Sequence, residues 1–131
     1  NVINEGSDLT IIGFSMSVHR ILSAFPEIQK LGLNPDIIDL RSIKPLDEEC
    51  IYQSVKKTNR VVIVEDGWGN TSFGSHLSYL IQSKCFDYLD SEIVKVSGKD
   101  VPMPYAENLE KAALITPDEI VFSVKKVLYR D

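Results

Sequence analysis

The sequence predicts an α/β fold, a three-layer sandwich with a mostly parallel central sheet between two layers of helices. Short apolar runs of strand length alternate along the chain with stretches that have the spacing of amphipathic helices, about 3.6 residues per turn. The clearest run, RVVIVE at residues 60–65, is β-branched and unbroken, as in a strand buried on both faces. Strands that alternate with helices in this way form parallel sheets covered on both sides.

Four strands are expected, and each is a short apolar run. The run at 60–65 supplies the central strand, since both of its faces are apolar. The others read LTIIGF, DIIDL and EIVKV, at residues 9–14, 36–40 and 92–96.

Four helices separate or follow these strands. Residues 18–31 have helical spacing, and Pro26 within them predicts a kink or a break. The second helix spans residues 47–58, and its first residue, an aspartate, is the expected N-cap. The third helix contains residues 77–81. The last begins at residues 116–119, where TPDE forms a capping box with proline in the first turn.

Length and composition indicate one globular domain. The chain has 131 residues, of which 44% are hydrophobic and 25% charged. The net charge of −5 argues against nucleic acid or an anionic membrane as a partner. No apolar run approaches the roughly 20 residues of a membrane span. Residues 1–8 are interpreted as a linker, and residues 9–131 as the domain. Cys50 and Cys85 make neither a disulfide framework nor a metal site.

The residues supply no complete nucleophilic or metal centre. The stretch GFSMS at 13–17 lies between a strand and a helix, like the nucleophile elbow of hydrolases, with Ser15 in the place of the nucleophile. Ser17 stands where that motif needs glycine, and helix capping is the alternative role for both serines. His19 and His76 lie in predicted helices without partners at metal-ligand spacing.

A possible ligand site follows the central strand. Glu65 and Asp66 stand at its carboxyl end, where α/β folds place ligands. The glycine-rich loop 67–74 comes next, but Ser72 replaces a glycine that a dinucleotide-binding loop needs. The alternative is that the acidic pair caps the next helix. A stand-alone ligand-binding α/β domain therefore remains the second functional hypothesis.

Four motifs resemble the transketolase C-terminal domain family, which includes the beta subunits of the thiamine diphosphate-dependent 2-oxo acid dehydrogenases. DLRSIKPLD at residues 39–47 is similar to the family's DLRxxxPxD segment, and SVKKTNR at 54–60 fits the same family. FDYLD at 86–90 and GKDVPMPYA at 98–106 resemble the pyruvate dehydrogenase beta subunits within it. The resemblance covers residues 5–128.

The resemblance implies a role in a larger enzyme. Its parent would be an oxidoreductase, pyruvate dehydrogenase (acetyl-transferring), which decarboxylates pyruvate and passes the acetyl group to a lipoyl arm. Thiamine diphosphate and magnesium would lie between an alpha subunit and a pyrimidine-binding domain that precedes this one. We therefore expect no catalytic, cofactor-binding or metal-binding residues in this chain, and an inactive isolated domain. The implied location is the mitochondrial matrix or the bacterial cytoplasm.

The resemblance also implies partner-binding residues. Asp90 matches an acidic position that binds the basic subunit-binding domain of the dihydrolipoyl acetyltransferase, although an aspartate there could instead cap the turn. Trp68 and Phe73 are candidates for the contact with a second beta subunit; the alternative is that Trp68 covers its own sheet edge. The proline-rich arm at 102–105 either covers the core or contacts another subunit.

Overall fold

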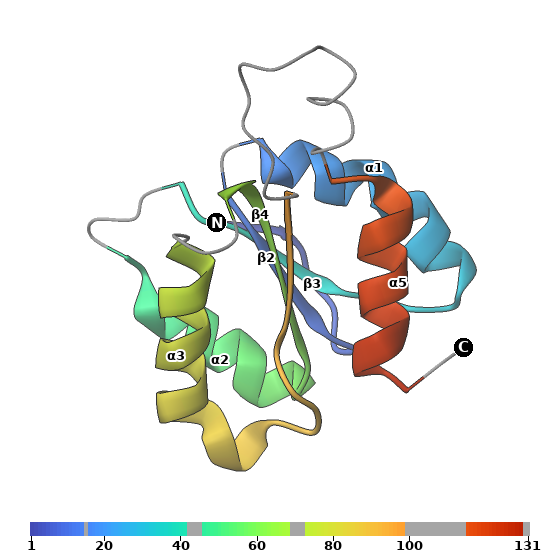
Figure 1. Cartoon of the computed structure of the whole chain (residues 1–131). Helices are drawn as coiled ribbons and strands as arrows, with labels where there is room; N and C mark the ends of the chain where they lie inside the picture. Colours follow the sequence, from blue (N-terminus) through green and yellow to red (C-terminus); the bar gives the residue numbers. More distant parts are fainter. Residues whose placement is uncertain (15, 42–45, 69–72, 99–114, 130–131) are drawn as a thin grey trace.

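A five-stranded sheet forms the centre of the computed structural model, which describes residues 1–14, 16–41, 46–68, 73–98 and 115–129 (Figure 1). The strand order is β1-β3-β2-β4-β5, and the four strands from β3 to β5 pair in parallel. β1 pairs antiparallel with β3 at the edge. The strands are β1 (Val2–Asn4), β2 (Thr10–Gly13), β3 (Asp36–Asp39), β4 (Val61–Trp68) and β5 (Val94–Gly98).

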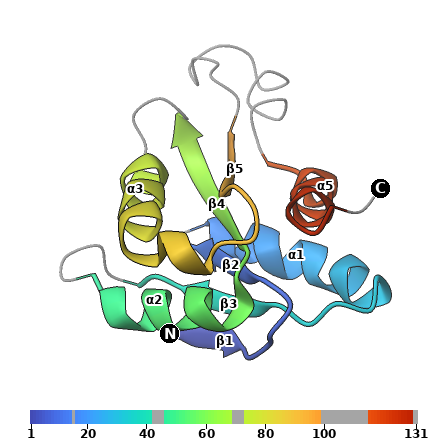
Figure 2. The same cartoon turned by 90° about the horizontal axis from the view of Figure 1, so that it is seen from below.

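Helices cover both faces of this sheet, so the predicted three-layer sandwich is confirmed. In Figure 2, α1 and α5 lie on one side of the strands and α2 and α3 on the other. A short 3₁₀ helix, η1, continues directly from α3. The helices are α1 (Ser17–Lys30), α2 (Glu48–Thr58), α3 (Phe73–Cys85), η1 (Phe86–Tyr88) and α5 (Pro117–Val127).

The apolar side chains of β4 divide between two cores. Val62 and Val64 belong to the cluster beneath α1 and α5, whereas Val61 and Ile63 belong to the cluster beneath α2 and α3. All four are fully buried. The unbroken apolar run therefore reflects burial on both faces, as the sequence predicts.

The two predicted caps are also present. The side chain of Asp47 accepts a hydrogen bond from the backbone N–H of Cys50 at 3.2 Å, which starts α2. Thr116 accepts one from the backbone N–H of Glu119 at 3.2 Å, and Pro117 opens α5. Each cap pairs one of the N–H groups that a helix start leaves without an intrahelical partner.

Three boundaries differ from the sequence prediction. Part of the expected linker 1–8 forms strand β1, whose short length and exposed Val2 and Ile3 give no alternating pattern. Of the kink or break predicted at Pro26, the break does not occur, because α1 continues through this residue to Lys30. β4 also runs three residues past Glu65, with an irregular register against β5 at its end.

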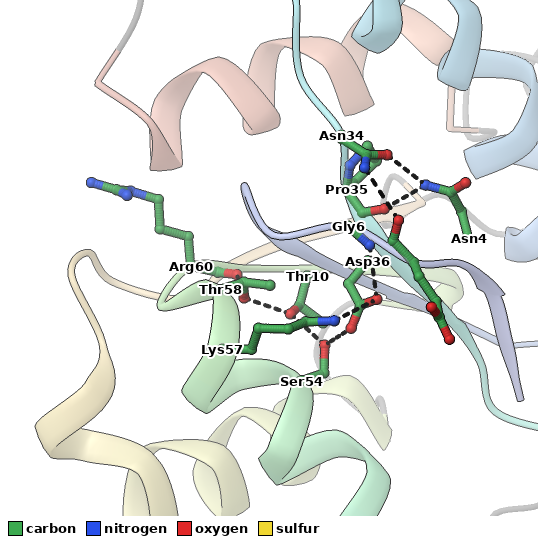
Figure 3. A network of polar contacts seen from close by, with 11 residues as sticks. Asn4, Gly6, Thr10, Asn34, Pro35, Asp36, Ser54, Lys57, Thr58 and Arg60 are labelled. Carbon is green, nitrogen blue, oxygen red and sulfur yellow. Dashed lines mark hydrogen bonds and ion pairs between the residues drawn. The ribbon is translucent and has the colours of Figure 1, made fainter.

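A buried polar network closes the amino end of the sheet (Figure 3). Asp36 is 3% exposed, and its carboxylate accepts hydrogen bonds from the backbone N–H of Gly6 and the hydroxyl of Ser54. Lys57 Nζ lies 3.2 Å from the same carboxylate. The Thr10 hydroxyl is 2.7 Å from that of Ser54, which links β2 to α2. A buried charge is tolerated here because it is paired and hydrogen-bonded.

We predict that Asp36→Ala lowers the free energy of unfolding by about 2–4 kcal/mol, because Gly6, Ser54 and Lys57 all lose their shared acceptor. Asp39→Ala is the matched control on the same strand, since the carboxylate of Asp39 pairs with exposed Arg41 at 3.8 Å. That control should cost less than about 1 kcal/mol. Urea unfolding monitored by circular dichroism measures both. Equal losses in the two variants would contradict a structural role for the network.

Candidate subunit-docking surface

Asp90 lies at the amino end of the parallel strands. It follows η1 and precedes β5, and its backbone N–H bonds to the carbonyl of Asn59, two residues before the start of β4. The carboxyl ends of the strands, where α/β folds usually bind small ligands, are at the opposite edge. A partner at Asp90 would therefore not compete with a ligand at that edge.

Three hydrogen bonds fix the backbone around Asp90. Its N–H donates to the carbonyl of Asn59 at 2.8 Å, and its own carbonyl accepts from the Tyr129 hydroxyl at 3.1 Å. The Asn59 side chain donates to the carbonyl of Tyr88 at 2.7 Å. Asn59 has a φ of 66°, a left-handed conformation that asparagine tolerates better than most residues. The loop that carries Asp90 is thus attached to both α2 and α5.

The carboxylate of Asp90 faces solvent. Its side chain is 56% exposed, and Arg60 Nη1 lies 3.8 Å from its Oδ2. Arg60 is itself oriented, because its Nε donates to the carbonyl of Val127 at 2.9 Å. Within the described part of the chain, the ion pair with Arg60 is the contact that the Asp90 carboxylate makes.

Exposed aromatic side chains belong to the segments that meet at Asp90: Tyr88 stands two residues before it, and the Tyr129 hydroxyl bonds to its main-chain carbonyl. Lys56 Nζ lies 5.4 Å from the ring centroid of Tyr88, a cation–π contact. Exposed aromatic groups gathered on one surface are more common at interfaces than on the rest of a protein. We call this region the Asp90 surface, and define it by Phe86, Asp87, Tyr88, Asp90 and Tyr129, all exposed.

Glu65, at the opposite edge, caps a helix. It is 3% exposed, and its Oε2 accepts a hydrogen bond from the backbone N–H of Gly74 in the first turn of α3 at 2.7 Å. This is the capping alternative that the sequence left open for the acidic pair. Its Oε1 is buried and has no hydrogen-bond partner in the described part of the structure. The side chain of Asp66 and residues 69–72 lie outside the described residues.

No hydrolase or metal centre is assembled by the described residues. The buried Ser17 hydroxyl accepts from the N–H of Phe14 at 2.8 Å and donates to its carbonyl at 2.7 Å, so it is bound within the turn. Ser15 lies outside the described residues. His19 and His76 are exposed on α1 and α3. In the ranges described, no three histidine, cysteine or acidic side chains gather as metal ligands.

Of the two candidates for a second-subunit contact, the structure describes the side chain of Phe73 but not that of Trp68. Phe73 is the first residue of α3 rather than a loop residue, and it is partly buried. Its ring packs edge-on against Phe14, with the centroids 5.5 Å apart. Part of Phe73 is therefore used within the domain. Trp68 ends β4, and its side chain, like the arm at 102–105, lies outside the described residues.

Three titratable groups are held in their neutral forms. Burial raises the pKa of the Cys85 thiol, and burial together with the nearby Asp47 carboxylate raises the pKa of Cys50. Burial and the hydrogen bond to Glu48 raise the pKa of Tyr52 to about 12. Both cysteines are free. A thiol that stays protonated at neutral pH is a poor nucleophile and a poor metal ligand.

None of the helices that the structure describes has the length and apolar character to cross a membrane.

Comparisons with known proteins identify the family. Residues 1–120 match the family model described as the transketolase C-terminal domain. The chain belongs to this family. Its fold agrees with that of a solved split-gene transketolase, described as an inactive beta4 tetramer, with a TM-score of 0.82 and 26% identity over 98% of this chain and 41% of that one. A 2-oxoglutarate:ferredoxin oxidoreductase from Magnetococcus marinus shares the fold, with a TM-score of 0.64 and 17% identity over 97% of this chain and 19% of that one.

Within the transketolase C-terminal domain family, the predicted resemblance to pyruvate dehydrogenase beta subunits is confirmed. The chain is 48% identical to the pyruvate dehydrogenase E1 component subunit beta of Rickettsia felis, over 98% of this chain and 39% of that protein. It is 45% identical to the mitochondrial subunit of Dictyostelium discoideum, over 99% of this chain and 36% of that protein. The chain thus spans about two fifths of the length of the curated relatives it matches.

Proposed function

We propose that this chain serves as the assembly domain of a pyruvate dehydrogenase beta subunit. The observation that carries the proposal is the identity of 45–48% to proteins of that name over nearly the whole chain. The parent enzyme would decarboxylate pyruvate oxidatively and transfer the acetyl group to lipoamide. The relatives include bacterial and mitochondrial proteins, which supports a bacterial cytoplasm or mitochondrial matrix as the location.

The chemistry of the described residues fits an assembly role. Thiamine diphosphate needs a diphosphate-and-magnesium site and a carboxylate for its pyrimidine ring. The buried carboxylates here have structural partners: Glu65 caps α3, and Asp36 joins the network at the amino end of the sheet. In the proposed function, the cofactor and magnesium are held by the preceding domain and the alpha subunit, and this domain contributes contacts between subunits.

We expect the chain alone to bind no thiamine diphosphate and to leave pyruvate unchanged, because the residues that the structure describes bring no such donor set together. Titration calorimetry with the cofactor and magnesium measures the first property, and a decarboxylation assay measures the second. The complete enzyme is the positive control for both. Saturable binding at micromolar cofactor would place a cofactor site in this domain and contradict the proposal.

The Asp90 surface is the proposed docking site for the subunit-binding domain of the dihydrolipoyl acetyltransferase. The Asp90 carboxylate is exposed and only loosely paired, since Arg60 is 3.8 Å away. An arginine from a partner could form a shorter, charge-assisted and bidentate pair with it. The hydrogen bonds with the Asn59 carbonyl and the Tyr129 hydroxyl hold the backbone of Asp90 in place before binding, which lowers the ordering cost of the loop.

We predict that Asp90→Ala weakens binding of the subunit-binding domain by about 2–5 kcal/mol, because the partner's arginine would be left desolvated and unpaired. The measurement is titration calorimetry with the assembled alpha and beta subunits at two salt concentrations. Glu49→Ala is the matched control, since it removes an exposed carboxylate from the first turn of α2, outside the Asp90 surface. The docking role is rejected if the Asp90 variant binds as tightly as the unmodified protein, or if the Glu49 variant loses as much affinity as the Asp90 variant.

We also propose contact with a second beta subunit and with an alpha subunit. The solved split-gene transketolase is described as a beta4 tetramer, which supports self-association of domains with this fold. Trp68 and Phe73 are the proposed contact residues, and aromatic side chains often dominate the energy of such interfaces. Because Phe73 is already packed against Phe14, Trp68 is the stronger candidate of the two.

The chain alone should form a weak dimer that Trp68→Ala abolishes, because an isolated domain lacks the contacts of the remaining subunit. Sedimentation velocity at rising protein concentration measures the association. Tyr79→Ala is the control, since Tyr79 is an exposed aromatic residue on the outer face of α3. A monomer at every concentration, or a dimer that Trp68→Ala leaves unchanged, would end this hypothesis.

A further inference from the structure

Residues 1–8, the expected linker, are attached to the domain at both ends. β1 pairs antiparallel with β3. The Asp39 N–H donates to the carbonyl of Asn1 at 2.8 Å, so the first residue lies at the carboxyl end of β3. Residues 4–8 bind residues 34–36 at the start of β3, and we call these two segments the linker clasp. The linker therefore leads into the domain from the carboxyl edge of the sheet, opposite the Asp90 surface.

Asn34 is the centre of the linker clasp (Figure 3). Its side chain accepts a hydrogen bond from Asn4 Nδ2 at 3.0 Å and donates one to the carbonyl of Glu5 at 3.2 Å. Its carbonyl accepts from the N–H groups of Ser7 and Asp8, at 3.1 and 3.2 Å. Its own N–H donates to the carboxylate of Asp8 at 2.6 Å. Bonds thus run in both directions between the two segments, so each backbone fixes the position of the other.

Gly6 is the point of closest approach in the linker clasp. A Cβ atom at this position would lie 2.1 Å from the carbonyl oxygen of Asn34 and 2.6 Å from that of Pro35, closer than non-bonded carbon and oxygen atoms approach one another. The Gly6 N–H donates to Asp36 Oδ1 at 3.2 Å. Asp36 cannot follow a displaced linker, because Ser54 of α2 donates to the same carboxylate. Any side chain at Gly6 would therefore push the linker away from the clasp.

Polar contacts and close backbone packing, rather than an apolar core, hold the linker. Val2 and Ile3 are 39% and 38% exposed, and the side chains of Glu5 and Ser7 also face solvent. Flexible linkers are rich in glycine and serine and behave as random coils, so the domains that they join move independently. Here the glycine instead brings two backbones together. The direction of β1 relative to the sheet is thus fixed by the linker clasp and by pairing with β3.

We propose that the linker clasp fixes the orientation of the pyrimidine-binding domain relative to this domain, with Gly6 as the positioning residue. In the proposed function, on which this inference rests, that domain precedes residue 1 and holds the cofactor together with the alpha subunit. It then lies at the carboxyl edge of the sheet, where β1 begins. Gly6 acts through the backbone of Asn34 and the carboxylate of Asp36. Without the clasp, the preceding domain would rotate about the linker, and small misplacements of reacting groups lower rates steeply.

Distances between the two domains test the proposal in the complete beta subunit, assembled with its alpha subunit. One spin label replaces Ser83, an exposed residue of α3, and the other replaces an exposed helical residue of the preceding domain. Both are attached to unnatural amino acids, which leaves the native cysteines unmodified, and labelled subunits are diluted with unlabelled ones. Pulsed electron resonance should give one narrow distance distribution for the unmodified protein and a broader or displaced one for Gly6→Ala. The kcat of Gly6→Ala should fall at least about tenfold, with the KM for pyruvate little changed.

Two further variants separate positioning from folding. Ser7→Ala is the matched control, because Ser7 contributes its backbone N–H to the linker clasp and the substitution keeps that group. It should leave both the distances and kcat unchanged. Asn34→Ala removes the side-chain bonds to Asn4 and Glu5 without adding bulk. Because Asn34 is exposed, this variant should fold even where Gly6→Ala does not, and it should broaden the same distances.

The outcomes distinguish the linker clasp from the proposed function. Unchanged distances in Asn34→Ala, or in a folded Gly6→Ala, overturn the proposal. Equal broadening in Ser7→Ala, or full kcat in a variant whose distances have broadened, also overturns it. Failure of the proposed function has a different signature, because the unmodified assembly would then be inactive toward pyruvate.

Discussion

Burial of β4 on both faces is the constraint on which the rest of the structure depends. Val61, Val62, Ile63 and Val64 are all fully buried, and each contributes roughly 1.5–3 kcal/mol when removed from water. A strand with no polar face must have helices on either side. Because its neighbours β2 and β5 are parallel to it, each connection crosses the sheet and brings one helix to a face. Loops therefore gather at two opposite edges of the sheet, and the Asp90 surface lies at one of them.

The turn at residues 58–60 connects most of the elements at the amino edge. The Thr58 hydroxyl lies 2.6 Å from that of Thr10 in β2, within the network that contains Asp36. Asn59 binds the backbone of Tyr88 and Asp90, and Arg60 binds the last residue of α5. Three consecutive side chains thus hold β2, the η1 loop and α5 in fixed relative positions. The geometry of the Asp90 surface follows from these polar bonds more than from the apolar cores.

The sequence predicts what local chemistry determines and misses what tertiary contacts determine. The apolar run of β4, the Asp47 cap and the Thr116 capping box each identify their element from neighbouring residues alone. Strand β1 gives no such signal, because its three residues are at least partly exposed and show no apolar pattern. They form a strand only by hydrogen bonding to the neighbouring strand β3. Pro26 is tolerated in α1 for a similar reason: packing of the helix offsets the missing hydrogen bond. At the candidate site, Asp90 is identified by resemblance, but its contacts with Arg60, Asn59 and Tyr129 join segments up to 39 residues apart, which no local pattern reveals.

Tyr129 connects the end of α5 to the Asp90 loop. Its hydroxyl binds the main-chain carbonyl of Asp90, not the carboxylate, so it fixes the loop without neutralising the charge of Asp90. The left-handed backbone of Tyr129 costs about 1–2 kcal/mol. Its N–H bonds to the carbonyl of Lys126 and its hydroxyl to that of Asp90, and each bond contributes about 0.5–1.5 kcal/mol. The two hydrogen bonds together therefore offset the strain of this conformation, and the position of the Asp90 loop depends on both.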